Sequence, residues 1–151
     1  MSTSDHSADA PADVPADVPA RAGATAGDPA DVSGPASFAV SVPEVPDAEL
    51  EVEDLDPGQI LSGTPVVTGK VLWESADGRQ LRGIWQITPG VVTDTEADEL
   101  FVVVSGRATI EVEGGATLEV GPGSACVLRE GDKTTWTVHE TLRKAYHISL
   151  P

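Results

Sequence analysis

Cysteine and basic residues are both scarce in this sequence of 151 residues. The single cysteine, Cys126, cannot form a disulfide within the chain or supply a cysteine-based zinc site. Its neighbours Ala125 and Val127 predict a buried small apolar residue rather than a reactive thiol. The chain has 9 Lys and Arg against 25 Asp and Glu, which gives a formal net charge of −16. Such a charge repels phosphate backbones and anionic lipids, so we expect no nucleic-acid partner and no membrane partner.

Long apolar segments are absent as well. No run approaches the ~18 apolar residues that a membrane-spanning helix needs. The first residues also lack the basic and apolar regions of a secretory signal, so we expect a cytoplasmic protein. Aromatic residues make up only 4% of the sequence, and Phe38 is the only one of them before residue 60.

The first 60 residues differ in composition from the rest of the chain. They carry a net charge of −12 and 8 of the 12 prolines, whereas residues 61–151 carry −4. Proline at every fourth position in residues 8–19 excludes a helix, and a few small apolar residues cannot offset the entropy of ordering such a segment. We therefore predict a disordered acidic extension rich in Ala, Pro and Asp at residues 1–47, and one domain at residues 48–151. We interpret the extension as solubilising, with a binding tail or a localisation peptide as the alternative.

From about residue 66 the apolar residues alternate with polar ones at a period of two. Gly114-Gly115 and Gly121-Pro122-Gly123 are typical of the tight turns that separate strands. No stretch has an apolar stripe of 3.6-residue period long enough for a helix. The spacing predicts an all-β sandwich or barrel, with strands at residues 71–73, 81–87, 100–104, 108–113, 117–120, 125–128, 134–138 and 144–148.

Several short motifs follow one another in this part of the chain. They are Gly83-Ile84-Trp85, Thr88-Pro89-Gly90, Glu99 and Gly106 with six residues between them, Gly121-Pro122-Gly123, Thr135-Trp136 and Arg143-Lys144-Ala145-Tyr146. In order and spacing they resemble the cupin superfamily, and most closely the branch of the ureidoglycine aminohydrolases and ethanolamine-utilisation accessory proteins. The resemblance covers roughly residues 48–151. It implies a cupin-type jelly-roll β-barrel and a homodimer.

The histidine ligands of the general cupin pattern are missing from this sequence. That pattern places two histidines shortly before the motif glutamate, which Glu99 matches, and a further histidine in the second motif. The corresponding positions hold Val92 and Asp94, or Thr93 and Thr95 with the shorter spacing, and Thr134. A transition-metal site needs about three or four converging donors. We therefore expect no bound metal and no cofactor.

Glu99 is the candidate catalytic residue. By strict alternation it shares a strand face with Phe101 and Val103, so we expect it inside the barrel. An apolar environment there would favour the neutral carboxyl group that general acid–base catalysis often requires. The structural alternative is an ion pair with one of Arg82, Arg129, Arg143 and Lys144. Before the apolar run, an acidic cluster is typical of a solvated loop, and it consists of Asp94, Glu96, Asp98 and Glu99.

The candidate ligand-binding residues are aromatic and polar side chains at alternating strand positions. Inward aromatic residues in a barrel of this size either wall a small ligand pocket or fill the core, and both roles remain open for each. The set is Trp85, Phe101, Thr134, Trp136, Lys144 and Tyr146. Lys144 could also act as an amine nucleophile, or the Arg143-Lys144 pair could bind acidic groups nearby.

Three functional hypotheses follow from these residues. The leading one is a cupin that binds a small polar metabolite in its barrel without a metal. The second, which the resemblance implies, is a metabolic enzyme of the aminohydrolase or a related acid–base type that uses Glu99. The third is an accessory protein that engages its partners through the acidic extension.

Overall fold

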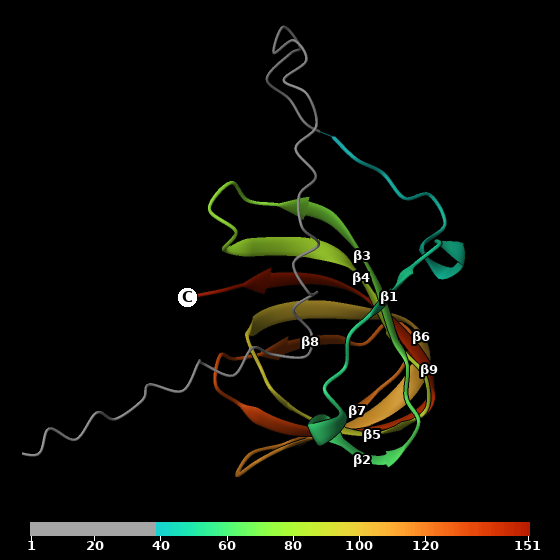
Figure 1. Ribbon diagram of the computed structural model, residues 1–151, viewed down its shortest axis with the longest axis vertical. Helices are drawn as coiled ribbons and strands as arrows, with labels where there is room; N and C mark the ends of the chain where they lie inside the picture. Colours follow the sequence, from blue (N-terminus) through green and yellow to red (C-terminus); the bar gives the residue numbers. More distant parts are fainter. Residues whose placement is uncertain (1–38) are drawn as a thin grey trace, which may run out of the picture.

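The computed structural model describes residues 39–151, which form one curled β-sheet (Figure 1). The sheet has nine strands and bends around a central core, which confirms the predicted all-β fold. Residues 1–38 of the predicted disordered extension, which was residues 1–47, lie outside the described residues. Within residues 39–151, no helix is long and apolar enough to cross a membrane.

All the strand pairs are antiparallel. The order across the sheet is β1-β3-β4-β9-β5-β2, and β6 pairs with β7, β8 and β9. Two short 3-10 helices precede the main strands. The elements are η1 (Val45–Asp47), β1 (Glu51–Glu53), η2 (Pro57–Gln59), β2 (Ile60–Gly63), β3 (Val67–Glu74), β4 (Gln80–Ile87), β5 (Gly90–Thr95), β6 (Asp98–Val112), β7 (Thr117–Val120), β8 (Ala125–Leu128) and β9 (Lys133–Ser149).

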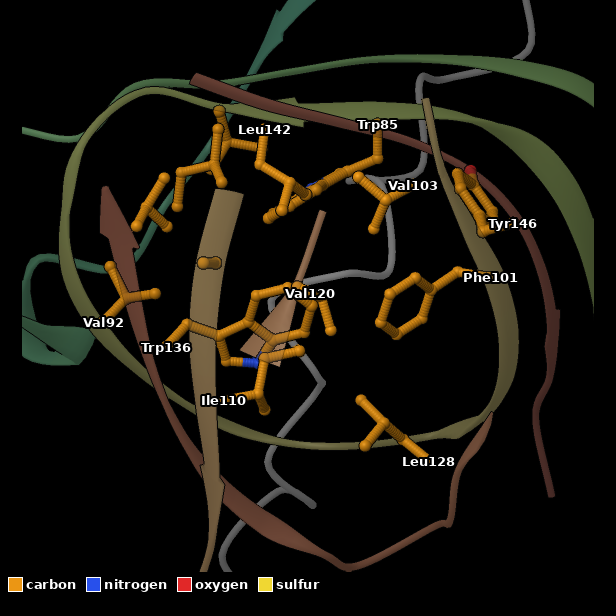
Figure 2. Close-up of a cluster of buried hydrophobic side chains, with 14 of the residues drawn as sticks. Trp85, Val92, Phe101, Val103, Ile110, Val120, Leu128, Trp136, Leu142 and Tyr146 are labelled. Atoms are coloured by element: carbon orange, nitrogen blue, oxygen red, sulfur yellow. The ribbon is translucent and has the colours of Figure 1, made fainter. Parts of the chain in front are cut away.

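Buried apolar side chains fill the space that the sheet encloses (Figure 2). Each strand from β3 to β9 contributes at least one of them, because alternate residues of a strand point to the same face of the sheet. Examples in strand order are Val67, Trp85, Val92, Phe101, Val120, Leu128 and Trp136. The enclosed face of the sheet is therefore the hydrophobic core of the protein.

β6 and β9 are longer than the alternation pattern predicted. The sequence indicated strand ends near residues 104–106 and 138–144, whereas β6 and β9 continue through these positions. The register between the two strands shifts three times between Val103 and Ala108. Gly106 lies within this irregular segment and has a φ of +84°. A bulge of this kind interrupts the period-two pattern without ending the strand, which is why the sequence signal was lost there.

The acidic cluster is not the solvated loop that the sequence predicted. Asp94 belongs to β5, and Asp94, Glu96 and Glu99 have relative exposures of only 7%, 1% and 3%. Asp98 alone of the four acids is exposed. β5 pairs with β2 on one side and β9 on the other, and Asp94 points to the enclosed face like the buried Val92 two residues before it. Three carboxyl groups are thus placed in the interior, where polar groups need partners.

Arg143 ties the segment around η1 to the sheet. Its Nη1 atom donates hydrogen bonds to the main-chain oxygens of Val45, Pro46 and Ala48 at 2.8, 2.8 and 3.0 Å, and its Nε atom donates to Oε1 of Gln86 at 2.8 Å. Val45 and Pro46, which the sequence analysis placed in the extension, are therefore bonded to β9. The predicted domain boundary between residues 47 and 48 stays a prediction.

Replacing Arg143 by alanine should lower the free energy of unfolding by about 2–3 kcal/mol, because hydrogen bonds from a buried charged group are lost. Proteolytic cleavage around η1 should become faster. Arg107→Ala is the control, since Arg107 forms an ion pair with Glu140 at 3.5 Å whose side chains are 57% and 61% exposed. Such surface pairs contribute at most about 1 kcal/mol. Equal effects of the two substitutions in urea unfolding would contradict this role of Arg143.

Candidate functional site

Glu99 and Lys144 form an ion pair inside the curled sheet. The Lys144 Nζ atom lies 2.8 Å from Oε1 and 3.0 Å from Oε2 of Glu99. The Lys144 side chain is 0% exposed and the Glu99 side chain 1%. Lys144 on β9 is the register partner of Val103 on β6, which lies four residues after Glu99 on the same strand. Of the four basic residues that the sequence left open as partners of Glu99, the structure selects Lys144.

Three aromatic rings surround the Lys144 ammonium group. Nζ lies 4.7 Å from the ring centre of Trp85, 4.5 Å from that of Phe101 and 5.0 Å from that of Trp136. Figure 2 shows these three rings in the enclosed core. Such cation–π contacts gain strength when the cation is shielded from water. The arrangement therefore stabilises a positive charge next to a carboxylate in an otherwise apolar interior.

A second buried polar group lies at the indole nitrogen of Trp136. The hydroxyl of Thr134 donates to Oε1 of Glu96, and Trp136 Nε1 donates to the same oxygen at 3.0 Å. Nε1 of Trp136 also lies 3.1 Å from Oγ1 of Thr134. Because the Trp136 ring faces Lys144 as well, this residue joins the Glu96 group to the Glu99–Lys144 pair.

A pocket of about 640 Å³ lies where β5 and β6 end and β9 begins. Two nearly buried residues, Asp94 and Thr134, belong to its lining and are register partners. Gln59 fixes Asp94 in place, because its Nε2 atom donates to Oδ1 of Asp94 at 3.3 Å and to the main-chain oxygen of Thr93 at 3.1 Å. The complete lining is mostly polar: Gln59, Thr93, Asp94, Thr95, Glu111, Val112, Glu113, Thr117, Lys133, Thr134 and Thr135.

The structure places most of the predicted site residues in two neighbouring regions, the core around Lys144 and the pocket. Glu99 and Lys144 lie in the core, and Trp85, Phe101 and Trp136 contact the Lys144 ammonium group. Thr134 is the member of the predicted set that lines the pocket. Tyr146 extends over Gly83, where its hydroxyl oxygen lies 2.6 Å from the position that a Cβ atom of Gly83 would take.

The sequence analysis missed Glu96 and Gln59 as members of this arrangement. Glu96 was assigned to a solvated loop, whereas its carboxylate accepts hydrogen bonds from two buried side chains. A glutamate two residues beyond Asp94 has the alternation of an inward strand face, and this spacing was the available signal. Gln59 comes from η2, far away in the sequence, so no local pattern could connect it to Asp94.

The residues at the cupin metal-ligand positions do not fit a transition metal. Val92 is a core residue, Asp94 is held by Gln59, and the hydroxyl of Thr134 is engaged with Glu96. Within residues 39–151, no group of three or more His, Cys, Asp or Glu residues is placed to hold a metal ion. A valine, a carboxylate and a hydroxyl are not the donor set of such a site.

Cys126 lies beside the ion pair on β8, in register with Phe101. The side chain is partly buried against the core. Burial raises the pKa of its thiol, an effect that the nearby Lys144 charge partly offsets. Cys126 is therefore a protonated thiol at neutral pH, in agreement with the expected unreactive residue.

A family model for the EutQ-like cupin domain matches residues 74–146. The EutQ protein of Clostridium difficile has a TM-score of 0.52 and 22% identity, over 64% of this chain and 75% of its own. The cupin domain of Schizosaccharomyces pombe Cnp3 has a TM-score of 0.52 and 10% identity, over 72% of each chain. These two likenesses concern the fold alone.

A DUF861-family protein of unknown function from Pseudomonas syringae is also similar. Its TM-score is 0.62 and its identity 26%, over 68% of this chain and 45% of its own, so this chain spans less than half of that protein. No curated protein sequence matches the chain. The family match over residues 74–146 and the curled all-β sheet support a small cupin-superfamily protein of the EutQ branch.

Proposed function

We propose that this cupin binds a small polar molecule in its barrel, at the pocket between the ends of β5 and β6 and the start of β9. The observation that carries the proposal is the position of Thr134. It belongs to the lining of a pocket of about 640 Å³, and its hydroxyl is also bonded to the buried Glu96. A ligand in this pocket therefore lies next to the hydrogen bond between Thr134 and Glu96. Trp136 donates to the same Glu96 oxygen and connects this group to the core.

The lining favours a ligand that offers several hydrogen-bond donors. Threonine hydroxyls, the carboxylate of Asp94 and the exposed carboxylates of Glu111 and Glu113 supply mainly acceptors. Gln59 holds Asp94 in one orientation before any ligand arrives, which lowers the entropy lost on binding. The proposal needs no metal, because the residues at the cupin ligand positions do not form a metal-binding donor set.

A panel of small polar metabolites, screened for a rise in the melting temperature of the full chain, tests this proposal. A ligand at 100 times its Kd should stabilise the protein by about 2.7 kcal/mol. Thr134→Val should remove this stabilisation, measured against the unliganded variant. Thr137→Val is the matched control, since Thr137 is also on β9 but does not line the pocket. Equal ligand responses of the two variants would show that the ligand binds elsewhere.

The second candidate function is acid–base catalysis by Glu99. The short contacts between its carboxylate and the Lys144 ammonium group favour it, because a proton can pass between groups at such distances. Glu99→Gln should then abolish turnover of a substrate that still binds. The homodimer and an accessory role of the acidic extension remain predictions.

A further inference from the structure

We propose that Lys144 is an imine-forming amine, and that the partner compound is a small neutral aldehyde or ketone. This goes beyond the binding proposed above, since it concerns a covalent bond at a different place in the barrel. A lysine amine reacts with a carbonyl compound when a neighbouring group takes its proton and apolar walls keep bulk water away. Lys144 is 0% exposed with three aromatic rings around it, and the Glu99 carboxylate lies 2.8 Å from Nζ as the group that can accept the proton.

Glu99 is the group that exchanges the proton. Its two carboxylate oxygens lie 2.8 and 3.0 Å from Nζ. Proton transfer to Glu99 gives a neutral amine, whose lone pair forms a C–N bond to the carbonyl carbon. The carbonyl oxygen takes up protons through Glu99, the C–O bond breaks, and one water molecule leaves. The ammonium ion and the carbonyl compound thus become an iminium ion and water, with no oxidant or reductant.

The aromatic rings suit the product as well as the reactant. The iminium ion carries the same single positive charge as the ammonium ion, at the same side chain. The ring contacts of Trp85, Phe101 and Trp136 at 4.5 to 5.0 Å, and the Glu99 carboxylate, can therefore stabilise both. Because the rings already lie within 5.0 Å of Nζ, a bound compound has to be small, and Glu99 disfavours an anionic one.

Trp85 supplies a hydrogen-bond donor for the carbonyl oxygen. Its indole Nε1 is buried and has no hydrogen-bond partner among the described residues. A buried donor without a partner is uncommon and costs about 1–3 kcal/mol. Trp85 is the register partner of Lys144, so this donor belongs to a residue that faces the amine. An oxygen on the carbon bonded to Nζ would satisfy it.

The edge strand β1 is the route by which such a compound can enter. The Glu53 carboxylate of β1 occupies the space that a side chain on Gly69 would take, and Gly69 is the register partner of Trp85. β1 has three residues, none of them buried, and pairs with β3 alone. Short edge strands of this kind open at a small cost in free energy. Displacement of β1 removes the Glu53 carboxylate from the space over Gly69 and so opens the enclosed face next to Trp85.

Reductive trapping on the wild-type full chain tests the proposal. The protein is incubated with limiting propanal and cyanoborohydride, digested, and analysed by mass spectrometry for propyl adducts. The chain has three lysines, and Lys70 and Lys133 are exposed, so they serve as internal references. We expect at least tenfold more adduct on Lys144 than on either reference. Adducts confined to Lys70 and Lys133 would overturn the proposal.

Two variants test the roles of the neighbouring groups. Glu99→Gln and Trp85→Phe should each lower the rate of adduct formation at Lys144 at least tenfold, while the rates at Lys70 and Lys133 stay the same. The two exposed lysines also report whether a variant is folded, because an unfolded chain would label all three lysines equally. An unchanged rate at Lys144 in a folded variant would contradict the role assigned to that residue.

Discussion

Replacing Glu99 by alanine is expected to lower the free energy of unfolding by about 3–5 kcal/mol. The substitution leaves the Lys144 ammonium group, which is 0% exposed, without the carboxylate that lies 2.8 Å away. The three ring contacts, at about 0.5–2 kcal/mol each, do not replace the full opposite charge that is lost. Lys144→Met should cost a similar amount, because it removes the cation that lies 2.8 Å from the buried Glu99 carboxylate. Urea-induced unfolding of both variants measures these losses.

The double variant Glu99→Leu with Lys144→Met distinguishes the stability contributed by the ion pair from the cost of burying only one of its two charges. Removing both charges and keeping side chains of similar volume is often neutral or even stabilising for a buried pair. We therefore expect the double variant to unfold close to the wild-type midpoint, far above either single variant. Additive losses in the double variant would mean that the pair itself, and not the avoidance of an unpaired charge, stabilises the barrel.

Glu140→Ala provides the comparison for an exposed pair. Glu140 lies 3.5 Å from Arg107, and both side chains are more than half exposed. Water screens such a pair, so the loss should stay below about 1 kcal/mol. A loss as large as that of Glu99→Ala would show that burial does not determine how much stability is lost when an ion pair is broken.

The strands that the sequence predicted are those with regular alternation and clear turn signals. Residues 81–87, 117–120 and 125–128 are strands within a residue of the predicted bounds. β5 was missed because its residues are glycine, valine, threonine and aspartate, which in sequence look like a turn followed by an acidic loop. The burial of Asp94 depends on pairing with β9 and on a hydrogen bond from Gln59, and neither is visible in a local pattern.

The sequence predicted that Glu99 points inward, but it could not identify its ion-pair partner. The alternation placed Glu99 on an inward face, and its burial agrees with that. Four basic residues were possible partners, and the choice between them depends on the register of β6 against β9. That register contains three irregularities near Gly106, so counting residues along the strands could not have given it. The pocket could not be predicted either, because its lining depends on where four strands begin and end.

Gly106→Ala should have the other large effect, a loss of more than about 3 kcal/mol in the free energy of unfolding. Gly106 has a φ of +84°, and an L-residue with a side chain pays about 1–2 kcal/mol for the left-handed region alone. A Cβ atom here would also overlap the main-chain oxygen of Thr141 and lie 2.6 Å from Cα of Leu142. These are backbone atoms of β9, so the central strand pair would have to move.

Gly114→Ala separates these two contributions. Gly114 has a φ of +70°, but nothing lies within 4 Å of the position that its Cβ atom would take. Its substitution should therefore cost only the conformational strain of about 1–2 kcal/mol. Urea unfolding of both variants gives the difference, which measures the close approach of β6 and β9 at the bulge. If the two losses are equal, the strands can separate at Gly106 without cost, and the bulge does not fix the register that places Lys144 opposite Val103 and within reach of Glu99.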